Sequence, residues 1–139
     1  MTSENEETIL ARIAEAAGGT LHKYPRPGTA VRRVILRDLR DDRRSQFEAI
    51  QLEDDGTVRI TGHDQGADVR AAFGDHISSY EWVYVVASDR VGNLIRQLGG
   101  AAEDDVLDLF AAYHARTGGI VSKVLKHPDV AASFSNWHS

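Results

Sequence analysis

The segment RITGHDQG, residues 59–66, places a histidine beside an aspartate between two glycines, at the end of an expected strand. A histidine with a nearby carboxylate can act as a general base, and both residue types are metal ligands. A metal site needs about three converging ligands, and no HExxH, HxH or HxxxH spacing occurs in the chain. If the chain does have a catalytic or ligand-binding site, its candidate residues are His63, Asp64 and His114, in a cleft beside the strand that holds Trp82.

The same segment has a purely structural interpretation, which we favour. Neighbouring residues of a strand point to opposite faces, so His63 and Asp64 would not face each other if the strand continued. In this interpretation Gly62 allows a bend or bulge, Asp64 caps the helix that starts at Gly66, and His63 is exposed.

Several kinds of catalytic chemistry have no support in the sequence. There is no cysteine, which excludes disulfides, thiolate nucleophiles and Cys-ligated metals within this chain. Neither a Gly-x-Ser-x-Gly elbow nor a Walker phosphate loop is present. We expect no metal and no cofactor.

An acidic cluster stands at the start of an expected helix and consists of Glu103, Asp104, Asp105 and Asp108. Its carboxylates can complement the positive end of the helix dipole, bind a cation, or face a basic protein partner. No EF-hand spacing is present, so a protein partner is more plausible than a metal. The predicted partner-binding surface combines this cluster with Asp64 and Asp68.

Aromatic and basic residues could together indicate nucleic-acid binding. Tyr80, Trp82 and Tyr84 alternate along one strand, but Glu81 and Asp89 are their charged neighbours, so core packing explains them better. The arginines of residues 32–44 are interleaved with aspartates, which indicates a salt-bridged face. We expect no nucleic-acid partner.

The length and the net charge of the chain limit the classes of protein to which it can belong. The 139 residues suit one domain, and the formal net charge is −5. Residues 29–62 balance seven arginines with seven acids, whereas residues 63–139 hold ten acids against six Lys and Arg. No apolar run approaches the ~20 residues of a membrane span, and the N-terminus MTSENEETIL is acidic. The sequence therefore predicts an acidic cytoplasmic protein with no membrane contact.

Hydrophobic periodicity predicts a single α+β domain over residues 1–139. A helix over 4–17 and a Pro/Gly-containing loop over 18–29 precede a sheet and helical remainder over 30–139. The expected strands of an antiparallel meander are 30–40, 44–53, 57–61 and 79–87, the last one central and covered on both faces.

Further helices are expected over 66–73, over 89–98 with Asp89 as cap, from the acidic cluster to Gly118, and over 120–126. The apolar tail, residues 133–137, is expected to dock as an edge strand. The fold class is thus an antiparallel meander of about four strands plus a short C-terminal strand, packed with four to five helices.

Three segments carry a family resemblance: LEDDGTVRITGHDQGADVRAAFG, YEWVYVVASDRVGNLIRQLGG and EDDVLDLF. They resemble a group of small, mostly actinobacterial proteins with the pattern D-G-x-[LV]-x-I-x-G-x-D-x-G, a Y-E-[WY] strand and a helix ending in Gly-Gly. The resemblance implies an α+β domain of the immunity or antitoxin type, and it carries no catalytic assignment that could be transferred to this chain. This chain has His63-Asp64-Gln65-Gly66-Ala67 where the group usually has Gln-Asp-Leu-Gly-Pro, which counts against His63 as a catalytic base.

Three functional hypotheses follow. The first is a non-enzymatic protein-binding domain, of the immunity or antitoxin type, which masks a basic toxin or another protein partner. The second is a small hydrolase or ligand-binding domain that uses His63 and Asp64. The third is a homodimeric structural protein built on the aromatic tail or on an exposed sheet edge.

Overall fold

The computed structural model describes residues 28–74 and 76–138, so the expected helix 4–17 lies outside the described residues. In chain order the elements are β1 (Ala30–Arg40), β2 (Arg44–Glu53), β3 (Val58–Gly66), α2 (Ala67–Phe73), β4 (Ser79–Val86), α3 (Val91–Gln97), α4 (Val106–Thr117), α5 (Ser122–Leu125) and β5 (Ser133–His138). The expected α+β class with a five-stranded antiparallel sheet is confirmed. The described residues form four α-helices, where four to five helices were expected.

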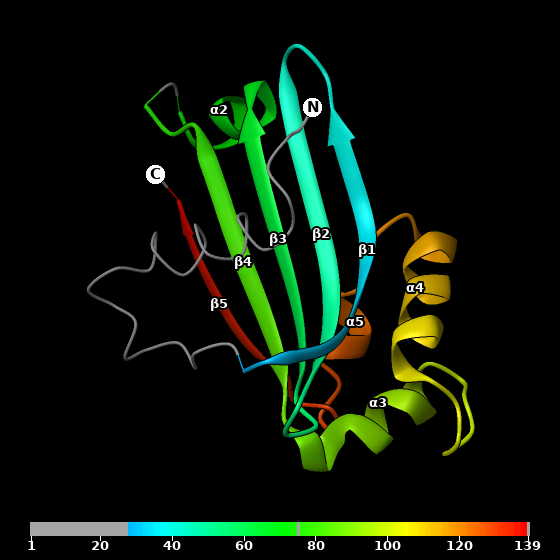
Figure 1. The fold of residues 1–139 in the computed structure, drawn as a ribbon. Helices are drawn as coiled ribbons and strands as arrows, with labels where there is room; N and C mark the ends of the chain where they lie inside the picture. Colours follow the sequence, from blue (N-terminus) through cyan, green and yellow to red (C-terminus); the bar gives the residue numbers. More distant parts are fainter. Residues whose placement is uncertain (1–27, 75, 139) are drawn as a thin grey trace.

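The sheet is a simple meander with strand order β1-β2-β3-β4-β5, and every neighbouring pair is antiparallel (Figure 1). Two aspartates set its first two turns. The Asp41 carboxylate accepts from the backbone N–H groups of Arg43 and Arg44 at 2.8 and 3.0 Å, and the Asp55 carboxylate accepts from the N–H of Thr57 at 2.9 Å. These contacts are Asx turns, which fix the register of the strands on either side.

The strand predicted to end at Thr61 continues for five more residues, and this corrects the sequence interpretation of residues 62–66. Register is unbroken from Val58 to Gly66, so Gly62 forms neither a bend nor a bulge. The helix that follows has Gly66 as its N-cap and no side-chain cap hydrogen bond. Asp64 is therefore not a helix cap.

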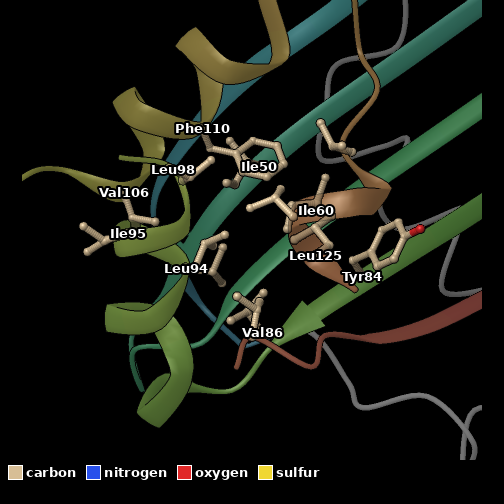
Figure 2. Packing of buried hydrophobic residues seen from close by; sticks show 14 of the residues in the cluster. Ile50, Ile60, Tyr84, Val86, Leu94, Ile95, Leu98, Val106, Phe110 and Leu125 are labelled. Carbon is tan, nitrogen blue, oxygen red and sulfur yellow. The ribbon is translucent and has the colours of Figure 1, made fainter. Parts of the chain in front are cut away.

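Helices α3, α4 and α5 cover one face of the sheet, and the main core lies between them and β2, β3 and β4 (Figure 2). Its fully buried side chains are Ile50, Val58, Ile60, Val86, Leu94, Leu107, Phe110, Leu125 and Val130. We call this side the helix-covered face. Helix α4 packs against β1 and β2, which leaves the β4–β5 side of the same face outside its reach.

Capping residues predicted from the sequence set some of the helix ends and not others. Asp105 caps α4, because its carboxylate accepts from the N–H groups of Leu107 and Asp108, and Gly118 ends that helix at φ 66°. The expected Asp89 cap is wrong, since α3 starts only at Val91 after a 3-10 turn and has no side-chain cap. Helix α5 is shorter than the expected 120–126.

The second side of the sheet, which we call the opposite face, carries buried polar groups. Glu53 accepts from the guanidinium of Arg59 at 2.8 Å and from the amide of Gln51 at 2.6 Å, and all three side chains are buried. Buried charges are tolerated when they are paired in this way. Among the described residues, no helix has the length and apolar character needed to cross a membrane.

Candidate functional site

The indole of Trp82 lies on the backbone of Gly62. The two residues are directly opposite each other on β4 and β3, on the helix-covered face. A Cβ atom on Gly62 would fall 2.0 Å from Cε2 of Trp82, well inside van der Waals contact. The first glycine of GHDQG therefore makes room for an aromatic ring and does not shape a loop.

Around this ring the β4–β5 side of the helix-covered face forms an open hollow of about 370 Å³, here called the aromatic groove. It is lined by Tyr80, Trp82, Tyr84, Gly119, Ile120, Val121, Ser122 and Phe134. Three of its rings touch: Trp82 and Tyr84 meet edge-on at 5.8 Å between centroids, and Tyr84 and Phe134 at 4.7 Å. Such geometry fixes the rings as a rigid apolar wall.

The rim of the groove is open to solvent. Phe134 on β5 is 45% exposed, and Ile120, which follows α4, is 68% exposed. At the floor, Tyr84 is buried, and burial, followed by the neighbouring Tyr80, raises the pKa of its phenol above the ordinary value of 10. The groove therefore offers apolar area at its rim and protonated tyrosine at its floor.

A second aromatic stack continues the groove toward α2. Phe73 of α2 stacks on Tyr80 at 5.3 Å and on His138 at 5.0 Å, and it is itself 42% exposed. Rings from α2, β4 and β5 thus extend the apolar surface beyond Trp82. Two ring clusters, one of Trp82, Tyr84 and Phe134 and one of Phe73, Tyr80 and His138, thus form from segments that are far apart in the sequence.

On the far side of Trp82, a buried carboxylate joins two basic side chains. Oε1 of Glu48 lies 2.7 Å from Nε2 of His114, and Oε2 of Glu48 lies 3.5 Å from the guanidinium of Arg37. Arg37 also donates to the carbonyl oxygen of Gly118 at 3.2 Å. His114 and Arg37 line a pocket of about 310 Å³ between β1 and α4. This cluster ties the end of α4 to β1 and β2.

A second buried His–Glu pair lies on the opposite face. His63 on β3 faces Glu81 on β4, with 3.3 Å between Nε2 and Oε1, and both are buried. Phe47 and Trp137 flank the pair in the same cross-strand row. Within the described residues, Oε2 of Glu81 has no hydrogen-bond partner. The expectation that His63 is exposed is therefore wrong.

The structure separates the predicted catalytic set. Since β3 continues, His63 points to the opposite face, whereas Asp64 lies on the helix-covered face opposite Tyr80. His114 is on the helix-covered face as well, against Glu48. Across residues 28–74 and 76–138 there is no group of three or more His, Asp or Glu side chains arranged to hold a metal ion.

The predicted partner-binding acids lie in two places. Asp105 and Asp108 both bind the guanidinium of Arg32 on β1, and Asp108 is the main cause of the raised pKa of Arg32. Asp104 accepts from the N–H of Ala101, and Glu103 is exposed. The start of α4 therefore lies beside β1, and β1 is at the opposite edge of the sheet from β4 and β5, which line the aromatic groove (Figure 1). Asp68 belongs to α2, and its side chain lies outside the described residues.

Sequence reasoning identified the aromatic strand but not the groove or the Glu48 cluster. Two signals in the sequence were available. The alternation of β2 places Glu48 on the same face of the strand as Gln46 and Ile50, and the apolar stripe of α4 includes His114. Only the fold brings these two residues together, because 66 positions separate them in the sequence.

Comparison of the chain with protein-family models, with curated proteins and with solved structures finds no match in any of the three.

Proposed function

We propose that this chain is a non-enzymatic protein-binding domain, of the immunity or antitoxin type, which masks a protein partner through the aromatic groove. The observation that carries the proposal is the open rim of the groove, where Phe134 and Ile120 stand exposed beside Trp82 and Tyr84. Contiguous apolar surface of this kind is typical of protein interaction sites.

The composition of the groove supports a protein partner. Tryptophan and tyrosine are the residues most enriched among binding hot spots, and they act from well-packed concave surfaces. The wall is rigid, since its rings pack on one another and Trp82 is held against Gly62. Rigid aromatic walls lose little conformational entropy on binding. The groove suits an apolar or aromatic side chain of the partner.

Charge supports a basic partner. The chain carries a formal net charge of −5, and the exposed acids Glu103, Asp104 and Asp108 stand away from the groove. Charges outside a contact region steer a partner of opposite sign and raise its association rate, and added salt removes the effect. In this proposal the groove provides the binding affinity and the exposed acids raise the association rate.

A matched pair of variants tests the proposal. Ile120 on the groove rim and Val31 on β1 are equally exposed, at 68% and 66%. The probe is the protein encoded beside the gene of this chain, measured by calorimetric titration and by protection from its toxicity on co-expression. Ile120→Asp should weaken binding about tenfold or more, as loss of a hot spot does, and Val31→Asp should leave it unchanged. No binding and no protection by the wild-type chain, or equal effects of both variants, would refute the proposal.

A second candidate function is binding of a small anion in the pocket beside Arg37 and His114. The observation in its favour is that two basic side chains line a hollow of about 310 Å³ and share one carboxylate. Titration with small carboxylates and phosphate, followed through the ring resonances of His114, checks it. Unchanged resonances at millimolar ligand would remove this candidate.

A further inference from the structure

The two edges of the sheet differ in their protection against further strand pairing. Strand β1 has register shifts between Ala30 and Arg32 and between Ile35 and Arg37, and it carries four arginines. Bulges and charges are the usual devices that keep an edge strand from pairing with another chain. The β1 edge is therefore blocked.

Strand β5 has none of these devices. Its residues, SFSNWH, include no Lys, Arg, Asp, Glu or Pro, and its register with β4 runs without a shift from Ser133 to His138. Among the strands of residues 28–74 and 76–138, it forms the outer edge of the sheet on the side away from β1 (Figure 1). An edge strand that has neither a bulge nor charged side chains can act as a template for a further strand.

We propose that β5 pairs with β5 of a second copy of this chain, antiparallel, to give a dimer with one continuous ten-stranded sheet. Charge favours a second copy as the occupant, because an uncharged strand meets its own copy with no like charges opposite each other. The same pairing through β1 would bring arginines of both copies together. A basic partner gains nothing from this edge, since it offers no opposite charge. This inference does not rest on the proposed function.

A register that centres on Ser135 keeps the two helix-covered faces on one side and pairs Ser133 to Trp137 of each copy. Ser135 then lies opposite its own copy, and Phe134 lies opposite Asn136 of the second copy. The two Phe134 rings become diagonal neighbours across the axis, at ~7–8 Å between backbones, which aromatic side chains span. Phe134 also forms the rim of the aromatic groove. The dimer therefore joins two grooves into one aromatic surface.

Sedimentation equilibrium of the full-length chain gives the first test. The wild-type protein should form a species of twice the 15.3 kDa chain mass, with micromolar affinity because a six-residue strand pair buries less than a standard interface. Ser135→Lys places like charges on the axis and should weaken the dimer about tenfold or more. Val31→Lys on β1 is the control and should leave the dimer unchanged.

A second variant, with the opposite charge at residue 135, distinguishes loss of the dimer from loss of folding. Ser135→Glu alone should dissociate like Ser135→Lys, whereas an equimolar mixture of the two should recover the dimer as a mixed pair. Circular dichroism of each variant confirms that the monomer remains folded. A monomeric wild-type protein, or a dimer that Ser135→Lys and Val31→Lys weaken equally, would overturn the inference.

Cross-linking tests the register. The chain has no cysteine, so a single introduced thiol can only link to its own copy. With a short thiol-reactive linker, Ser135→Cys should give a covalent dimer and Val31→Cys should not. Absence of the cross-link in a protein that sediments as a dimer would contradict pairing centred on Ser135.

Discussion

Trp82 occupies the space that a side chain on Gly62 would need, with its Cε2 atom 2.0 Å from the position of that missing Cβ. Any residue other than glycine at this position must displace the indole or push the strands apart. We expect Gly62→Ala to lower the free energy of unfolding by about 1–3 kcal/mol, the usual cost of overpacking. Urea denaturation followed by circular dichroism measures it.

Two controls make the Gly62 prediction specific. A Cβ on Gly92 in α3 meets nothing within 4 Å, so Gly92→Ala should stabilise the protein by about 0.5–1 kcal/mol through helix propensity. In a Trp82→Ala background, Gly62→Ala should cost little, because the ring is gone. An equal cost in both backgrounds would show that the contact with Trp82 is not the reason for glycine.

The Glu48 carboxylate should matter more to stability than any surface carboxylate. Glu48→Ala leaves the buried His114 and the guanidinium of Arg37 without their shared acceptor, which should cost about 3 kcal/mol. Asp38→Ala removes an exposed partner of Arg40 and should change stability by less than about 0.5 kcal/mol. Similar losses in the two variants, measured by urea denaturation, would contradict a structural role for the buried cluster.

Asp105 has two separable contacts, the helix cap and the pairing with Arg32. Asp105→Ala removes both and should cost about 1 kcal/mol. Asp105→Asn keeps an equally good cap and loses only the exposed ion pair, so most of the stability should remain. Thermal denaturation of both variants decides the matter. If the Asn variant is as unstable as the Ala variant, the ion pair and not the cap is the main contribution.

Asp41 should make stability fall in acid. Its carboxylate accepts from the backbone N–H of Arg43, chiefly, and of Arg44, which holds its pKa below the ordinary value of 3.8. The folded state therefore prefers the ionised form. Its contribution is complete above the unfolded pKa and is lost as pH falls through the lower, folded pKa.

Comparison with Asp41→Asn isolates this contribution, because the amide does not titrate in the same range. The difference in unfolding free energy between wild type and variant should be constant above about pH 5 and should shrink toward about pH 3. Urea denaturation across this range measures it. A difference that stays constant down to the lowest pH would contradict a lowered pKa for Asp41.

Local patterns in the sequence were enough to predict much of the fold. The β-branched and alternating runs of β1 and β2 gave their observed bounds, and the acids at 103–105 with Gly118 predicted the ends of α4 to within a few residues. These signals are short-range, since caps, turns and alternation act within a few residues.

Local patterns did not predict the structure of residues 62–66. Glycine near the end of an apparent strand usually indicates a bend, and Gly62 is instead required by Trp82, 20 positions later in the sequence and on the neighbouring strand. Once the strand continues, alternation sends His63 to Glu81 and Asp64 to the other face. The candidate site depends on such long-range pairings, which no local pattern of a single sequence contains.

The central claim is that the aromatic groove receives a protein partner, and Trp82 can report it directly. The chain has two tryptophans, Trp82 in the groove and Trp137 on the opposite face, so Trp137→Phe leaves Trp82 as the only source of tryptophan emission. The measurement is acrylamide quenching of this variant with and without the protein encoded by the adjacent gene. We predict that the bound partner shields Trp82 and lowers its quenching constant, while the Trp82→Phe variant, which reports Trp137, stays unchanged. Binding that leaves the quenching of Trp82 unchanged would contradict the claim.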